Sequence, residues 1–166
     1  MKKKIVFIMN PISGTSSKAA VPSLIDSTLD KEQFEYEIKM TERPEHASEL
    51  AAEARDNHAD IVVAVGGDGT VNEVARSLVH SDSALGILPC GSGNGLARHL
   101  LLPMNLKKSI EIINACEIHD LDYGVINEYP FFCTCGMGFD AFVSMKFAES
   151  GKRGPISYAE NILREG

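Results

Sequence analysis

The chemistry of this sequence is clearest in a short glycine-rich segment with one acidic residue at its centre. Residues 66–70 read Gly-Gly-Asp-Gly-Thr and follow an apolar run at residues 61–65. Glycines let the backbone approach a phosphate closely, and a helix that begins after them offers free N–H groups and the positive end of its dipole. The Asp68 carboxylate would repel a phosphate unless a divalent cation or a proton lay between them. The segment therefore predicts a site for a magnesium-bound nucleotide rather than for simple phosphate.

Asp68 has two other interpretations. It could orient or deprotonate an attacking hydroxyl, because phosphoryl transfer depends on positioning and charge neutralisation. It could also merely satisfy backbone amides in a tight turn between a strand and a helix. Thr70 and Glu73 fit a capping box that serves the first N–H groups of a helix, a role that needs no ligand. The sequence leaves these alternatives open.

Two further glycine-bearing segments have similar surroundings. Residues 91–95, Gly-Ser-Gly-Asn-Gly, precede a predicted helix and offer a hydroxyl and an amide to a phosphate or a substrate hydroxyl. Residues 10–14, Asn-Pro-Ile-Ser-Gly, follow an apolar run, although such dipeptides also mark plain turns. The fingerprints GxxxxGK[ST] and GxGxxG are both missing, which disfavours the P-loop and dinucleotide-binding folds.

Apolar runs and helical patterns alternate along most of the chain and predict an α/β fold with a mainly parallel sheet. In such sheets ligands gather at the carboxyl ends of the strands, where all three glycine loops and Thr41 are expected. One shared cleft is therefore predicted. The expected strands cover residues 5–9, 34–40, 61–65 and 85–88, and the expected helices cover residues 17–29 and 106–115 and segments that follow residues 44, 69 and 95.

The pattern changes after residue 117. Residues 118–127 and 131–135 are typical of two antiparallel strands joined by a turn at residues 128–130, and a helix is expected over residues 139–150. So few elements cannot bury a core alone. Residues 1–117 are accordingly predicted to form a nucleotide-binding domain, and residues 118–166 the opening of an incomplete second domain.

Composition limits the classes of partner. The 166 residues are 44% apolar and 23% charged, as in a soluble globular protein. A net charge of -7 disfavours nucleic acid and broad adhesion to anionic membranes, although local basic patches are compatible with it. Four cysteines without a CxxC pair indicate reduced thiols and a cytoplasmic protein, and the histidines show no metal-ligand spacing. The first apolar run is too short for a membrane span, so a lipid substrate would be met by transient binding to the membrane surface.

Taken together, the motifs resemble those of the diacylglycerol kinase catalytic domain family in type, order and spacing. The matching segments are residues 10–14, 66–74, 91–98, 118–124 and 136–141. The resemblance implies a three-layer α/β/α nucleotide-binding domain, similar to that of phosphofructokinases and NAD kinases, followed by a β-sandwich domain that helps to form the lipid site. It also implies a transferase that moves the γ-phosphate of ATP to a lipid hydroxyl.

The lipid itself is ambiguous. Bacterial diacylglycerol kinases tend to carry an aspartate after the asparagine of the second glycine motif, whereas this chain has Gly95. Its Gly-Ser-Gly-Asn form is more similar to the sphingosine and ceramide kinases, so diacylglycerol and a sphingoid base are both candidates. The alternatives are an NAD-kinase-like enzyme with a soluble substrate, which residues 91–98 disfavour, and a nucleotide-binding regulator without transfer activity.

The resemblance also assigns residues. Asp68 would be catalytic and would lie beside Mg²⁺ and the reacting phosphate, Asp122 would join that metal network, and Asn94 and Arg98 would contact the substrate. The family's later catalytic carboxylate and further metal ligands would lie beyond Gly166, so the chain alone is expected to be inactive. Its second-domain strands lack partners and predict self-association, with a homodimer as one form. The residues expected to contact ATP are Asn10, Pro11, Ile12, Ser13, Gly14, Thr41, Gly67, Asp68, Gly69, Thr70, Val71, Asn72, Glu73 and Ser92.

Overall fold

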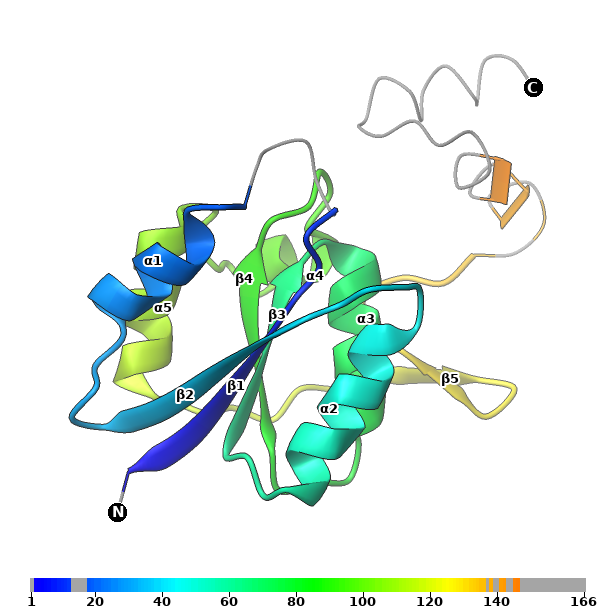
Figure 1. Ribbon diagram of the computed structural model, residues 1–166. Helices are drawn as coiled ribbons and strands as arrows, with labels where there is room; N and C mark the ends of the chain where they lie inside the picture. Colours follow the sequence, from blue (N-terminus) through cyan, green and yellow to red (C-terminus); the bar gives the residue numbers. More distant parts are fainter. Residues whose placement is uncertain (1, 13–17, 137, 139–140, 143–144, 147–166) are drawn as a thin grey trace.

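A four-stranded parallel sheet forms the centre of the protein (Figure 1). The computed structural model describes residues 2–12, 18–136, 138, 141–142 and 145–146. The strand order is β2-β1-β3-β4, so the two most apolar strands occupy the middle of the sheet. Every residue of β3 is buried, as expected for a parallel strand covered on both faces. The strands are β1 (Lys3–Met9), β2 (Phe34–Met40), β3 (Ile61–Gly66) and β4 (Ala84–Pro89).

Helices cover both faces of the sheet and complete the predicted three layers (Figure 1). On β1, alternate side chains supply two separate cores, because successive residues of a strand point to opposite faces. Val6 and Ile8 join the core under α2 and α3, whereas Ile5 and Phe7 join the core under α1 and α5. The helices are α1 (Val21–Thr28), α2 (His46–Asp56), α3 (Asp68–Leu78), α4 (Gly95–His99) and α5 (Leu106–Ala115).

The short helix α4 ends in a Schellman motif. The Leu101 N–H donates to the Arg98 carbonyl at 3.0 Å, and the Leu102 N–H donates to the Ala97 carbonyl at 2.8 Å. Leu101 has a φ of 57°, in the left-handed region that this motif usually fills with glycine. A residue with a Cβ pays roughly 1–2 kcal/mol for that conformation.

The segment after α5 forms an antiparallel hairpin of β5 (Gly124–Ile126) and β6 (Tyr129–Phe131). The predicted strands were too long, and the turn lies at Asn127 and Glu128 instead of residues 128–130. Both turn residues have positive φ, as a two-residue hairpin turn requires. Pro130 lies in an edge strand, where its missing N–H is tolerated.

The rest of the predicted second domain is described only in part. Of the expected helix at residues 139–150, Ala141, Phe142, Met145 and Lys146 are helical, and its other residues lie outside the described ones. The hairpin contacts the rest of the protein through Tyr123, whose hydroxyl lies 3.1 Å from His80 Nε2. Its outer side chains stay exposed, with Val125 at 59% and Tyr129 at 69%. The β-sandwich and the domain boundary at residue 117 stay predictions.

Candidate functional site

The strand order places a switch point between β1 and β3. From β1 the chain crosses to β2 on one side, whereas β3 and β4 lie on the other side. The ends of the strands are level, because Met9 pairs with both Met40 and Val65, and Gly66 pairs with Pro89. Ligands of open α/β sheets bind at such points. The structure therefore brings the described parts of the three loops, together with Thr41, to one edge of the sheet, as predicted.

Two of the glycine loops touch through their backbones. A Cβ on Gly91 would lie 2.4 Å from the Gly67 Cα, and a Cβ on Gly67 would lie 3.1 Å from the Gly91 Cα. Packing between the loops therefore requires the absence of a side chain at Gly91, and a side chain at Gly67 would make a tight contact with the Gly91 backbone. Gly66 is restricted in the same way, because its Cβ would lie 2.4 Å from the Thr70 hydroxyl oxygen.

Gly69 differs from its neighbours. A Cβ placed there would meet no heavy atom within 4 Å, and its φ is outside the left-handed region. Neither packing nor backbone conformation requires a glycine at this position, although glycine costs stability in a helix. The missing side chain leaves the backbone open at the first turn of α3. That helix also has no side-chain cap at Gly67, so its first N–H groups suit an anion.

Asp68 joins the two glycine loops. It is the first residue of α3, and its Oδ1 accepts a hydrogen bond from the Gly95 N–H at 2.6 Å. Its Oδ2 faces Gly93, where an added Cβ would lie 2.7 Å away. The aspartate satisfies an amide of the neighbouring loop rather than of its own turn, while its side chain stays exposed. It is thus fixed in position and still accessible to a ligand.

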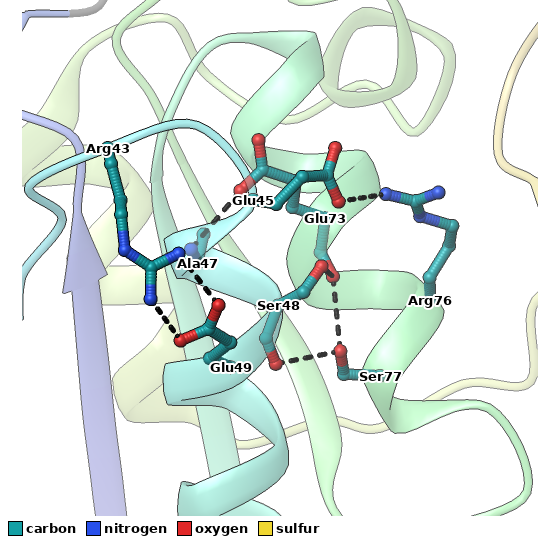
Figure 2. A network of polar contacts seen from close by, with 8 residues as sticks. All are labelled: Arg43, Glu45, Ala47, Ser48, Glu49, Glu73, Arg76 and Ser77. Atoms are coloured by element: carbon teal, nitrogen blue, oxygen red, sulfur yellow. Dashed lines mark hydrogen bonds and ion pairs between the residues drawn. The ribbon is translucent and has the colours of Figure 1, made fainter.

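The predicted capping box at Thr70 and Glu73 is wrong. The helix begins two residues before Thr70, so Thr70 lies inside the first turn. Its buried hydroxyl oxygen instead accepts from Asn10 Nδ2 at 3.4 Å, which ties the β1 loop to α3. The Glu73 carboxylate accepts the Ala47 N–H at 3.1 Å and so caps α2, a helix whose own N-cap residue, Glu45, supplies no side-chain bond (Figure 2).

Glu73 belongs to a polar network between α2 and α3 (Figure 2). Ser48 Oγ donates to the Glu73 carbonyl at 3.0 Å, and Ser77 Oγ donates to the Ser48 carbonyl at 2.9 Å. Arg76 pairs with Glu45 at 2.9 Å. Burial, and then the nearby Glu45 charge, raise the pKa of the Glu73 carboxyl above its usual value. The network fixes α3 against α2 and thereby positions Asp68, while the predicted nucleotide contact of Glu73 stays a prediction.

Two other residues near the start of α3, Val71 and Asn72, differ in exposure. The Val71 side chain is buried in the core, so only its backbone can face a ligand. Asn72 is half-buried on the same turn.

The β1 loop is held by a lysine that the sequence analysis missed. Lys18 is 6% exposed, and its Nζ donates to the Asn10 carbonyl at 2.6 Å. Asn10 Oδ1 accepts the Ile12 N–H at 3.1 Å, and the Asn10 N–H donates to Val65 at 3.1 Å. Ser13 and Gly14 lie outside the described residues. No local pattern marks a lysine that folds back over eight residues of chain.

An open cavity of about 350 Å³ lies beside this loop, between the ends of β1 and β2 and the start of α1. Thr41 is buried at the end of β2, and its N–H donates to the Met9 carbonyl at 2.9 Å. The cavity therefore adjoins the β1 loop and the end of β2 next to Thr41, which are both predicted to contact the nucleotide. It is lined by Met9, Pro11, Lys18, Ala19, Pro22 and Met40.

The second glycine loop is closed by its own asparagine. Asn94 is buried, its Oδ1 accepts the Gly91 N–H at 2.8 Å, and its Nδ2 donates to the Gly91 carbonyl at 2.8 Å. Arg98 Nε donates to the Gly93 carbonyl at 2.9 Å, while Ser92 is exposed. Asn94 and Arg98 thus shape the loop, and their predicted substrate contacts stay predictions.

One side chain from the hairpin segment reaches this loop. An added Cβ on Gly95 would lie 3.2 Å from Cys133 Sγ, so the exposed Cys133 borders the site. In the sequence, Cys133 is one of four cysteines without a CxxC pair, and no motif marks it as part of a site. Its position here results from contacts far apart in the chain and could not be inferred from a local pattern.

The predicted metal network is incomplete within the described residues. Asp122 lies exposed between α5 and β5, and no three His, Cys, Asp or Glu side chains of the described chain come together as a metal site. Mg²⁺ is often bound through one or two carboxylates and the substrate phosphates, with water as its remaining ligands. The accessible Asp68 carboxylate, fixed beside the open backbone of Gly69, fits that pattern.

The fold and its switch point define an α/β domain whose candidate site lies at the carboxyl ends of parallel strands. Comparison with known proteins identifies the family. The profile of the diacylglycerol kinase catalytic domain matches residues 4–126, and the chain belongs to this family of lipid kinases.

Curated relatives include the diacylglycerol kinases of Staphylococcus saprophyticus and Staphylococcus haemolyticus. Each is 31% identical over 163 residues; the matches cover 95% of this chain, 53% of the first relative and 49% of the second. The chain thus spans about half the length of these relatives. A crystal structure of a diacylglycerol kinase from Bacillus anthracis matches with a TM-score of 0.66 at 24% identity, covering 78% of this chain and 48% of the other, and it supports the fold.

Across the described part of the chain, no helix combines the length and the apolar character needed to cross a bilayer.

Proposed function

We propose that this chain is the nucleotide-binding half of a lipid kinase that transfers the γ-phosphate of ATP to a lipid hydroxyl. The observation that carries the proposal is the position of Asp68, which bridges two glycine loops beside the open backbone of Gly69. A phosphate chain placed over Gly69 meets the uncapped start of α3. The same placement brings it next to a carboxylate held by the Gly95 amide.

The residues around Asp68 would act mainly by positioning. The contact between Asn10 and Thr70 holds the β1 loop against α3, and the close approach of Gly67 and Gly91 fixes the spacing of the two phosphate-binding loops. Asp68 is the residue that would hold Mg²⁺, and this ion would supply neutralisation of the charge that develops during transfer. Asp68 would keep the lipid hydroxyl and the γ-phosphate in register.

Diacylglycerol is the first candidate substrate, because the relatives carry that name. The local form of the site keeps a sphingoid base as the second candidate. An added Cβ on Gly95 would lie 3.5 Å from Asp68 Oδ1, so an aspartate at this position would place a second carboxylate beside the first. Its absence gives this chain a less negative site.

Binding of nucleotide without transfer is the second candidate function for the chain by itself. It is favoured by the length of the chain, which spans about half of its relatives. It is also favoured because no three His, Cys, Asp or Glu side chains of the described residues come together to hold a metal ion. In this case a further segment would supply the lipid pocket and the remaining metal ligands. The protein would act in the cytoplasm, with transient binding to membranes.

Transfer is tested in a longer protein that carries this chain. The protein is incubated with radiolabelled ATP, Mg²⁺ and either vesicle-borne diacylglycerol, sphingosine or ceramide, or soluble NAD. We expect label in one of the three lipids and none in NAD. Absence of label in every lipid, from a folded protein with Mg²⁺ present, would contradict the proposal.

A further inference from the structure

An exposed apolar segment lies next to the second glycine loop. In the α4–α5 loop, which comprises residues 100–105, Leu101 is 88% exposed, and Leu100 and Met104 are 38% and 37% exposed. Leu102 and the following Leu106 pack against the two cores instead. The core therefore uses some of the apolar residues of this segment and leaves three of them in solvent.

Leu101 is unfavourable in two respects. Its side chain is almost fully exposed, and its backbone occupies the left-handed position of a Schellman motif, where glycine is usual. Glycine would make the same two backbone hydrogen bonds without the steric cost of a Cβ. Because neither packing nor backbone conformation accounts for a leucine here, its side chain indicates contact with an external apolar surface.

The charged side chains of the loop and of the residues that flank it in sequence are all basic. Residues 83–110 contain no Asp or Glu, although the chain as a whole has 23 acidic and 16 basic residues. The positively charged side chains of this segment are Arg98, Lys107 and Lys108, and these three and His99 are exposed. The nearest acidic residues along the chain are Asp82 and Glu111. In space, the Asp68 carboxylate accepts a hydrogen bond from the Gly95 N–H, within this segment.

The loop lies at the same edge of the sheet as the glycine loops. Met104 Sδ lies 3.8 Å from Asn94 Nδ2, and Arg98 holds the Gly93 carbonyl. At the other end of α5, Cys116 lies 3.1 Å from Nζ of Lys3, which begins β1. The start of α5, with its two lysines, therefore lies near the carboxyl ends of the strands (Figure 1).

We propose that the α4–α5 loop is the surface by which this protein docks on an anionic membrane. The side chains of Leu100, Leu101 and Met104 enter the boundary between headgroups and acyl chains. The side chains of Arg98, Lys107 and Lys108 contact lipid phosphates around them. The inference rests on the proposed function, because docking here brings a membrane-borne hydroxyl to the edge of the sheet where Asp68 lies.

The charge pattern favours a membrane over a second copy of this chain. An apolar loop flanked in sequence by basic side chains complements an anionic surface, whereas two copies of the loop brought together would repel each other. Partial insertion of a leucine and attraction of a few basic side chains give weak, reversible binding, as expected for an enzyme that visits membranes.

Vesicle binding by the 166-residue chain tests the proposal without ATP or turnover. The chain is sedimented with vesicles of phosphatidylcholine, alone or mixed with phosphatidylglycerol. Leu101→Gly is the main variant because glycine suits the backbone, and Lys107→Gln/Lys108→Gln tests the charges. Ile118→Gly is the matched control, since Ile118 is 59% exposed but lies outside the loop.

We expect binding that requires phosphatidylglycerol. It should fall about fivefold in Leu101→Gly and about tenfold in the double lysine variant, and it should be unchanged in Ile118→Gly. Equal binding to neutral vesicles would overturn the anionic assignment, and unchanged binding by Leu101→Gly would overturn the role of the loop. Dissociation of an oligomer by Leu101→Gly, with vesicle binding intact, would show that the loop joins copies of the chain and would also overturn it.

ATP binding measured on the same samples separates the two proposals. A loop variant that loses vesicle binding but still binds ATP would show that the loop serves docking and not nucleotide binding. Absence of ATP binding from a chain that still binds anionic vesicles would contradict the proposed function and leave the docking surface standing.

Discussion

The start of α3 and the end of α4 show opposite departures from local preference. At the start of α3, Gly69 stands where a side chain would meet nothing within 4 Å. At the end of α4, Leu101 stands where the backbone suits glycine and the side chain is 88% exposed. Each choice costs stability in the folded chain. Positions that disagree with their own structure are candidates for function, and both of these lie at the edge of the sheet where the glycine loops meet.

The largest effect is expected for Asp68 at the start of α3, where one substitution should reduce phosphoryl transfer without reducing stability. Asp68→Asn keeps an oxygen that can accept the Gly95 N–H but removes the negative charge. In a longer protein that carries the chain, we expect phosphoryl transfer to fall at least about 100-fold, while the free energy of unfolding changes by less than about 1 kcal/mol. Transfer rates and urea unfolding would be measured together. Equal losses of transfer and stability would instead indicate a turn-stabilising aspartate.

A methyl group at Gly69 should improve the fold and harm ligand binding. Gly69→Ala has room in the structure and replaces a glycine within a helix, so we expect a gain of about 0.5 kcal/mol in unfolding free energy. We also expect the affinity for Mg-ATP to fall at least about tenfold, because the methyl group would occupy the space over the backbone that the phosphates need. Calorimetric titration and thermal unfolding of the two proteins would check this. Unchanged affinity would leave Gly69 without a functional explanation.

At the end of α4, Leu101→Gly is the variant that corresponds to Gly69→Ala at the start of α3. Relief of the left-handed strain, less the greater entropy that glycine loses on folding, predicts a net gain of about 0.5–1 kcal/mol in unfolding free energy. The variant should bind Mg-ATP like the wild type, in contrast to Gly69→Ala. A lower melting temperature would show that the exposed leucine stabilises the fold and would weaken the comparison.

Glu73 lies on α3, as Gly69 does, but it caps α2 and so stabilises the fold. A substitution there should have a smaller effect on the unfolding free energy, and this effect should depend on pH. A carboxyl with a raised pKa holds its proton more tightly in the folded state than in the unfolded state. Its contribution to the free energy of unfolding is therefore fully present below the usual pKa of 4.5 and is lost as pH rises through the raised pKa. Glu73→Gln should remove this pH dependence while its amide oxygen still caps α2. The measurement is the difference in unfolding free energy between the wild type and Glu73→Gln, from below pH 4.5 to above the raised pKa of Glu73. A difference that does not change with pH would contradict the assignment.

Local patterns predicted the parts of the fold that depend on local physics. The apolar run of β3 and the helix α5 lie where they were expected, because burial on both faces and helical periodicity both leave a trace in the sequence. The glycine loops were found for the same reason. Their placement at one edge followed from the parallel sheet rather than from any single motif.

The missed features depend on contacts between distant residues. Glu73 looked like a cap for its own helix and instead caps α2, because α2 starts without a cap of its own. Lys18 gave no signal before the chain folded back on Asn10. The hairpin turn was predicted at residues 128–130, whereas the positive φ values fall on Asn127 and Glu128. Leu101 is unusual only once its backbone conformation and exposure are known.

The most direct test of the central claim is a calorimetric titration of Mg-ATP into the wild-type 166-residue chain. We expect saturable binding at one site, which weakens markedly when Mg²⁺ is omitted, because Asp68 then faces the phosphates without a cation. A folded chain that binds no ATP, or that binds it equally well without Mg²⁺, would contradict the proposed nucleotide site.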